Sequence, residues 1–242
     1  MRIINIVDEV SAVNFGIWNA AIATSEYLHR DFNVQSEIWY PHTDFNVDFS
    51  KYIGLTGKAL PSTSQPYLIE HILPHLKATE DLIVTHGAWR FPTRWGALLK
   101  EKGFRWVYVP HGMLEPWSMA QKKWKKLVYF HMMENRLVKK ADLVRAVGFP
   151  EFKNLKKFFL NVVHITNGVP DLEGWLPKLN TPPFNCLFMA RLHYKKGIVP
   201  LVEAWLESKL CHNKQFRLTI AGPDDGELGK VQDLLKTASD SN

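Results

Sequence analysis

The sequence alternates between short apolar runs and longer segments with helical spacing, and this alternation limits the folds open to the chain. Such a pattern is typical of βαβ units, in which helices cover both faces of a parallel sheet. Up to residue 169 the predicted strands are 2–7, 35–40, 81–86, 105–110, 143–146 and 162–166, and the predicted helices lie around 17–28, 95–101, 121–140 and 150–159. Residues 1–169 are therefore predicted to form a complete, doubly wound, Rossmann-like α/β domain.

A stretch rich in proline and glycine, residues 170–182, is the best candidate for a linker. Beyond it the pattern restarts, with strands predicted at 185–190 and 217–221 and helices at 198–208 and 227–238, the last one started by Asp224. Residues 183–242 are thus predicted to be the first βαβα part of a second Rossmann-like domain. Two parallel strands leave apolar faces open, so we expect the first domain or a partner to cover them, or this unit to be poorly ordered.

Composition excludes several classes of protein. Hydrophobic residues make up 46% and charged residues 22% of the chain, as in a packed protein rather than a disordered one. No apolar run is long enough to cross a bilayer, and the N-terminus is charged again by Asp8, which indicates a strand and a cytoplasmic protein. Cys186 and Cys211 have no CxxC spacing and are expected to be reduced thiols, and no metal or other cofactor is expected.

The net charge of +6 is unevenly distributed. One cluster consists of Lys122, Lys123, Lys125 and Lys126. A basic, amphipathic stretch suits an anionic membrane surface or another polyanion, and these lysines are the candidates to face a membrane. A solvated helix face explains the same charges equally well.

Residues at the carboxyl ends of the predicted strands are the candidates for chemistry, because ligands of open α/β sheets bind there. His86-Gly87 and His111-Gly112 each lie at the end of a predicted strand, where glycine lets the backbone bring an imidazole close to a ligand. Either histidine could equally be a turn residue whose ring caps a carbonyl, and for His86 this second interpretation is favoured. The loop 191–197 carries Arg191 and Lys196 and opens onto a predicted helix N-terminus, a combination that favours a phosphate or diphosphate but also occurs in exposed basic turns. The sequence contains no GxGxxG after a strand, no GxxxxGK[ST] and no GxSxG, which weakens the dehydrogenase, P-loop and α/β-hydrolase hypotheses.

Four segments resemble motifs of family 4 glycosyltransferases of the GT-B fold. They are HGMLEPW at 111–117, ITNGV at 165–169, FMARLHYKKG at 188–197 and LTIAGPDDG at 218–226, in the family's order. The lysine-rich segment that follows HGMLEPW also resembles this family. The first hundred residues match only in architecture.

The resemblance implies a transferase that moves a sugar from a nucleotide-diphosphate donor to a glycan or lipid-linked acceptor with retention, in cell-surface polysaccharide or lipopolysaccharide synthesis. Arg191 and Lys196 would bind the donor diphosphate, and Gly16, on the loop after the first strand, would let the backbone approach the donor. His111 would be catalytic, facing the transferred sugar, and Glu115 would contact acceptor or orient its loop. The partners implied are a nucleotide-sugar and an acceptor, with no nucleic acid.

The family's acidic EX7E segment, which binds the donor sugar and ribose, has no equivalent in residues 1–242. The resemblance therefore implies a chain truncated within its second domain, feeble or inactive by itself. The alternative is a non-catalytic fragment that binds acceptor, a membrane surface or a separately encoded C-terminal half. A basic module for nucleic acid or lipid is the third hypothesis, and the order of the motifs counts against it.

Overall fold

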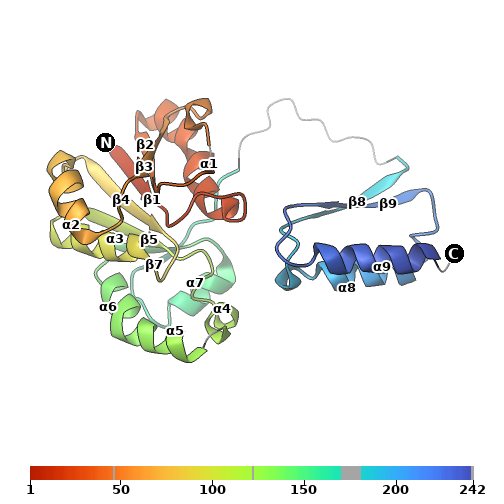
Figure 1. Ribbon diagram of the computed structural model, residues 1–242. Helices are drawn as coiled ribbons and strands as arrows, with labels where there is room; N and C mark the ends of the chain where they lie inside the picture. The colour runs from red at the N-terminus through yellow and green to blue at the C-terminus, as the bar shows by residue number, and fades with distance from the viewer. Residues whose placement is uncertain (46, 122, 170–180, 241–242) are drawn as a thin grey trace. The chain divides into compact units, whose positions relative to one another are not determined.

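The computed structural model describes residues 1–45, 47–121, 123–169 and 181–240, and the chain forms two compact units, Met1–Asp171 and Leu172–Asn242 (Figure 1). Residues 170–180 of the predicted linker lie outside the described part of the chain.

The first unit is built on a seven-stranded parallel sheet with the order β3-β2-β1-β4-β5-β6-β7. The strands are β1 Arg2–Ile6, β2 Gln35–Pro41, β3 Leu55–Leu60, β4 Asp81–His86, β5 Arg105–Val109, β6 Leu143–Ala146 and β7 Val162–His164. The direction in which strands are added reverses between β1 and β4. This arrangement confirms the predicted doubly wound, Rossmann-like architecture.

The prediction of six strands was wrong by one, because it missed β3. This edge strand pairs only with β2, and only its ends, Leu55 and Leu60, are buried. Gly57 and Lys58 interrupt any alternation of apolar and polar residues. Gly57 is needed for packing, since a Cβ there would lie 2.2 Å from Cδ2 of Phe49. Edge strands carry a weak apolar signal for this reason.

Helical segments cover the sheet (Figure 1). They are α1 Phe15–Phe32, η1 Phe49–Lys51, α2 Gln65–Tyr67, η2 Leu68–Ile72, η3 Leu73–His75, α3 Phe91–Glu101, α4 Pro116–Ala120, α5 Lys123–Tyr129, η4 Phe130–Glu134, α6 Asn135–Val138 and α7 Phe149–Leu155. The helix predicted over 121–140 is found as α5, η4 and α6, where η4 is a π-helical turn. The core between sheet and helices includes three fully buried tryptophans, Trp39, Trp95 and Trp106.

The second unit contains two parallel strands and two helices. Its elements are β8 Phe184–Met189, η5 Tyr194–Lys196, α8 Ile198–Glu207, β9 Phe216–Ala221 and α9 Leu228–Asp240. The predicted helix start is present, since Oδ1 of Asp224 accepts hydrogen bonds from N–H groups up to Leu228, at 3.0 Å. Helices pack against one face of the strands, while Leu187 and Met189 are 62% and 77% exposed. Apolar surface of β8 is thus left open, as two strands alone predict.

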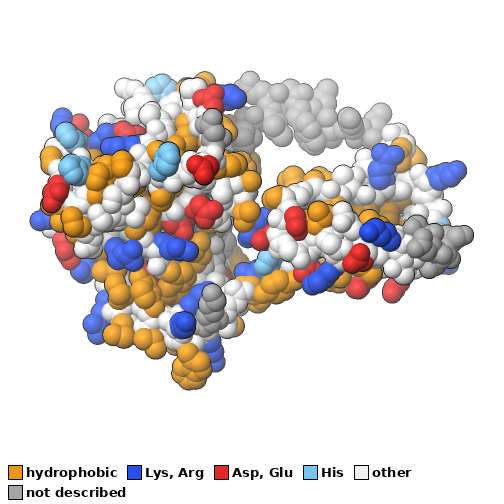
Figure 2. Space-filling model, viewed as in Figure 1, with side chains coloured by type: hydrophobic (Ala, Val, Ile, Leu, Met, Phe, Trp, Pro, Cys, Tyr) orange, Lys and Arg blue, Asp and Glu red, His pale blue; other side chains and the backbone are white. Residues whose placement is uncertain are grey.

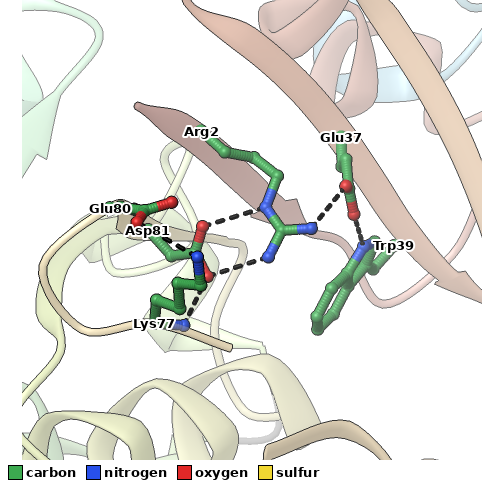
Figure 3. Close-up of polar contacts among 6 residues, drawn as sticks. All are labelled: Arg2, Glu37, Trp39, Lys77, Glu80 and Asp81. Atoms are coloured by element: carbon green, nitrogen blue, oxygen red, sulfur yellow. Dashed lines mark hydrogen bonds and ion pairs between the residues drawn. The ribbon is translucent and has the colours of Figure 1, made fainter. Parts of the chain in front are cut away.

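An ion-pair network joins three strands of the first unit around Arg2 (Figure 3). The Arg2 guanidinium donates from Nε and an Nη to the carboxylate of Asp81 on β4, at 2.9 and 2.8 Å, and to Glu37 on β2 at 2.9 Å. Asp81 also accepts from the backbone N–H of Lys77 at 2.8 Å. Burial acts to raise the pKa of Asp81, but these donors outweigh it and hold that pKa below its ordinary value.

We expect Asp81→Asn to lower the free energy of unfolding at pH 7 by about 1–3 kcal/mol, because it removes charge-assisted bonds from a buried acceptor. A depressed carboxyl pKa stabilises the fold above the unfolded value of about 3.9, and this contribution is lost as the pH falls below it. The difference in the free energy of unfolding between variant and wild type, measured by urea denaturation, should therefore be smaller at pH 3 than at pH 7. Glu80→Gln is the control, since the exposed Glu80 side chain pairs with the exposed Lys77 amine and not with Arg2. An equal effect of both changes would contradict the role of the network.

Candidate functional site

The carboxyl ends of β1 and β4 meet where the strand order reverses, and a chain of polar side chains, two of them buried and the third half-buried, lies there. Asn5 is on β1, His86 is the last residue of β4, and His111 follows β5. Nε2 of His86 is 3.0 Å from Oδ1 of Asn5, and Nδ1 of His86 is 2.9 Å from Nε2 of His111. The two imidazoles are stacked, with an interplanar angle of 22°.

The partners of Asn5 fix the protons along this chain. Nδ2 of Asn5 donates to the backbone carbonyl of Glu37 at 3.1 Å, so its Oδ1 faces His86 as an acceptor. Nε2 of His86 must then carry the proton, which leaves Nδ1 of the neutral ring as an acceptor for the Nε2–H of His111. Nδ1 of His111 therefore carries no proton, and its lone pair can accept a hydrogen bond from a hydroxyl group.

Both rings are held neutral. Burial lowers the pKa of His86, which is 1% exposed, and the charges of His111 and Arg145 add to this effect. Burial, followed by the charge of Arg145, lowers the pKa of His111 to about 4. The Arg145 guanidinium is itself fixed by hydrogen bonds to the backbone carbonyls of Ile165 and Thr166, at 3.0 and 2.7 Å.

The loop that carries His111 is held in shape by α7. His111 and Gly112 both have positive φ, at 52° and 74°. The buried carboxylate of Glu151 accepts from the N–H of Gly112 at 2.5 Å, and Nδ2 of Asn154 donates to the carbonyl of Leu114 at 2.8 Å. Sequence reasoning missed Glu151 and Asn154. The available signal was two polar residues on the face of a predicted helix that should pack inward.

Glu115 ends this loop and directly precedes α4. Its Oε1 is buried and has no hydrogen-bond partner among the described residues. Burial, together with the nearby charge of Glu151, raises the pKa of Glu115. A carboxyl group in such a position has capacity for a further hydrogen-bond donor.

Asp8 lies beyond the end of β1. Burial raises its pKa, and Arg90, 4.0 Å away, opposes that shift. A Cβ at Gly87, which has φ of +87°, would lie 3.4 Å from Cε of Met113 and 3.9 Å from Oδ1 of Asp8. The His86-Gly87 turn therefore lies close to both neighbouring strand-end loops.

Gly16 is not on a loop as the sequence analysis expected. It is the second residue of α1, and a Cβ built there would have no atom within 4 Å. The turn that starts the helix already begins at Asn14, whose carbonyl accepts a hydrogen bond from the N–H of Ile17 at 2.9 Å.

In the second unit, the loops after β8 and β9 are joined through Leu192. Its N–H donates to the carbonyl of Pro223 at 2.9 Å, and its carbonyl accepts from Asp225 at 3.2 Å. Gly222, with φ of +151°, allows this approach, since a Cβ there would lie 1.9 Å from the Ala190 oxygen. One Nη of Arg191 donates to Asp225 at 2.8 Å, a pair that the sequence analysis did not foresee.

Lys196 and the start of α8 complete this loop. Lys196 is exposed, and Gly197, with φ of +68°, precedes a helix that has no side-chain cap. The N–H groups of Ile198 and Val199 are the first of α8 and have no carbonyl within the helix to bond. Arg191 and Lys196 thus lie on one loop of the second unit, whereas His111 and Glu115 lie on one loop of the first.

Lysines of the predicted membrane-facing cluster differ from one another. Lys123 and Lys125 are exposed on α5, and Lys122 lies outside the described residues. Lys126 instead is half-buried, because its amine donates to the carbonyl of Ser118 at 2.6 Å and lies 5.8 Å from the centre of the Trp89 ring. Within the described ranges, no three His, Cys, Asp or Glu side chains gather as metal ligands would.

No family model matches the sequence, and no curated protein matches it. Solved structures of glycosyltransferases do match the fold. The lipopolysaccharide outer core galactosyltransferase WaaB, in its apo form, is 14% identical with a TM-score of 0.59, and HepE of Anabaena, in complex with UDP and glucose, is 17% identical with a TM-score of 0.61. Each comparison covers 99% of this chain and 65% of the other. TarM is 12% identical with a TM-score of 0.62, over all of this chain and 74% of its own.

At these identities the likeness shows the fold. The chain has the α/β architecture of GT-B proteins, with one complete Rossmann-like domain and a βαβα part of a second, as the sequence predicts. It spans about two thirds of the length of the solved structures it matches.

The hydrogen-bond chain predicts one tautomer for each histidine. In ¹⁵N NMR spectra at pH 7, His86 and His111 should both carry their proton on Nε2, and His111 should titrate at about 4. Protonation of the unfolded chain near 6.5 then makes the protein less stable as the pH falls from 6.5 toward 4. A His111 ring that carries its proton on Nδ1, or that titrates near 6.5, would contradict this assignment.

Proposed function

We propose that the chain is a glycosyltransferase, or the larger part of one, that moves a sugar from a nucleotide-diphosphate donor to a glycan or lipid-linked acceptor with retention. Cell-surface polysaccharide or lipopolysaccharide synthesis is the proposed setting. The fold supports this, since several proteins that share it are glycosyltransferases, one of them solved with UDP and glucose and another with UDP and α-GlcNAc-glycerol.

The observation that carries the proposal is the loop between β8 and α8. It presents an ammonium group at Lys196, a guanidinium at Arg191 and the uncapped N-terminus of a ten-residue helix. Backbone N–H groups at a helix N-terminus favour anions, and a guanidinium binds phosphate oxygens by paired donors. Asp225 occupies one Nη of Arg191, which orients the group and leaves donors on its other nitrogens. A diphosphate suits this set best.

In the proposed reaction, the bond between the anomeric carbon of the sugar and the donor diphosphate breaks, while an acceptor hydroxyl oxygen forms a new bond to that carbon. Negative charge grows on the departing nucleotide diphosphate, which takes up the proton that the hydroxyl loses. Arg191, Lys196 and the first N–H groups of α8 would stabilise that charge. In the first unit, Nδ1 of His111 would accept a hydrogen bond from a sugar or acceptor hydroxyl, and Asn5 and His86 would hold the ring in the tautomer that permits it. Glu115 would contact the acceptor or orient the loop that carries His111.

A second candidate function is that of a non-catalytic subunit that pairs with a separately encoded C-terminal half. The exposed Leu187 and Met189 on β8 favour it, because helices of a completed doubly wound sheet would cover that face. Sugar transfer by the purified 242-residue chain would exclude this second function.

Calorimetric titration with UDP and GDP tests the proposed donor site. We expect either nucleotide to bind, and Lys196→Ala to weaken binding about tenfold through loss of one charge-assisted contact. Lys214→Ala, which removes an exposed lysine from the same unit, is the matched control and should bind as the wild type does. Uridine, which lacks phosphate, should not bind measurably. Equal affinities of the Lys196 and Lys214 variants would refute the assignment.

A further inference from the structure

The surface formed by the described residues of 116–140 exposes large apolar side chains, which the other described elements of the first unit leave accessible. Trp124 is 79% and Met132 is 64% exposed. Further members of this surface are Trp117, Val128 and Met133, all of them exposed. An apolar hollow on it, of about 510 Å³, is lined by Trp124, Lys125, Val128, Tyr129, Met132 and Met133. Surface of this kind marks an interaction site rather than a solvated helix face.

The spacing of these residues forms one stripe. Trp124, Val128 and Met132 follow each other at intervals of four residues along α5 and η4. In a regular α-helix this spacing drifts around the axis, but a π turn takes more residues per revolution and reduces the drift. The inward face of the same run holds Phe130 and Glu134, both buried. The π turn thus keeps the outer stripe apolar while it places a carboxylate in the core.

Cations flank the stripe, and of those on residues 116–140, Lys140 pairs with an exposed carboxylate, that of Glu101. Lys123, Lys125, Arg136 and Lys139 are exposed, and none has a carboxylate within ion-pair distance among the described residues. The one acidic residue of 116–140, Glu134, is fully buried, where Thr93 and Tyr108 each donate to it at 2.9 Å. Figure 2 shows hydrophobic side chains together with Lys and Arg at the end of this unit where Figure 1 labels α5 and α6.

The surface is fixed to the rigid part of its unit. Trp89, three residues beyond His86, packs edge-on against Tyr129 and Phe130, with ring centres 6.0 and 6.4 Å apart. The bond from Lys126 to Ser118 ties α5 to α4, and α4 starts directly after the His111 loop. A preformed surface needs no further folding in order to bind.

We propose that the face formed by residues 116–140 docks on the anionic surface of a lipid bilayer, with Trp124, Val128 and Met132 inserted at the interface and Lys123, Lys125, Arg136 and Lys139 against the headgroups. Apolar and aromatic side chains flanked by Lys and Arg are the combination that interfacial helices use. A protein partner would have to present carboxylates to the cations and apolar surface to the stripe at matching positions. An anionic bilayer supplies negative charge and an apolar interior over any area. No helix in the described ranges is long and apolar enough to cross a membrane.

This docking stands independently of the transfer reaction. Under the proposed function it would bring the His111 loop to the level of the headgroups, where the sugar of a lipid-linked acceptor lies.

Co-sedimentation of the full chain with vesicles tests the proposal. We expect binding to vesicles of phosphatidylcholine and phosphatidylglycerol at 3:1, weak binding to pure phosphatidylcholine, and release of much of the bound protein by salt. Lys123→Gln/Lys125→Gln should weaken binding about 10- to 30-fold, and Trp124→Ser/Met132→Ser should weaken it about tenfold or more. All four positions are exposed, so each variant should keep the wild-type melting temperature.

Two matched variants serve as controls. Lys209→Gln/Lys214→Gln removes the same charge from exposed positions of the second unit, and Phe32→Ser removes an apolar side chain that is 72% exposed elsewhere. Both should bind vesicles as the wild type does. Failure of the wild type to bind anionic vesicles, or equal losses in the control variants, would overturn the proposal. So would a dimer seen by light scattering that Trp124→Ser/Met132→Ser disperses, because the face would then be a contact between copies of the chain.

Discussion

The parallel pairing of β1 with β2 on one side and β4 on the other is the constraint on which the first unit depends. It brings segments 79 residues apart to neighbouring positions, with Arg2 opposite Asp81 and Asn5 opposite Val84. At the amino ends of these strands, the Arg2 guanidinium joins β1, β2 and β4 by ion pairs. At the carboxyl ends, the same pairing sets Asn5 against His86. The amino ends of these strands therefore carry a stabilising network, and their carboxyl ends carry the part of the candidate site that lies in the first unit.

The architecture was readable from the sequence because the central strands of the sheet contain short runs of apolar residues. β4 and β5 are of this kind, while β3 escaped detection because it lies at an edge and contains Gly57 and Lys58. Helix ends were predicted less well than helix positions. The run from α5 to α6 was expected as one helix, and a π turn that places Glu134 in the core is not a feature that periodicity can reveal.

The residues of the candidate site were likewise predicted only in part. His111, Arg191 and Lys196 stand at strand ends, where sequence position alone directs attention. The residues that hold them were not foreseen: Glu151 and Asn154 act on the His111 loop from a helix, and Asp225 reaches Arg191 from another loop. Tertiary packing brings such partners together from separate parts of the chain, so no local sequence pattern predicts their contact. The exposed stripe at Trp124 was hidden for a related reason, since a helical pattern does not say which apolar face stays uncovered.

The central claim is that the start of α8, with Arg191 and Lys196, is a diphosphate site. Amide chemical shifts recorded during titration of the ¹⁵N-labelled chain with UDP test it most directly. The account predicts that the largest changes fall on Gly197, Ile198 and Val199, and that inorganic pyrophosphate produces changes at the same amides. Shifts that saturate elsewhere in the chain, with these three amides unmoved, would contradict it.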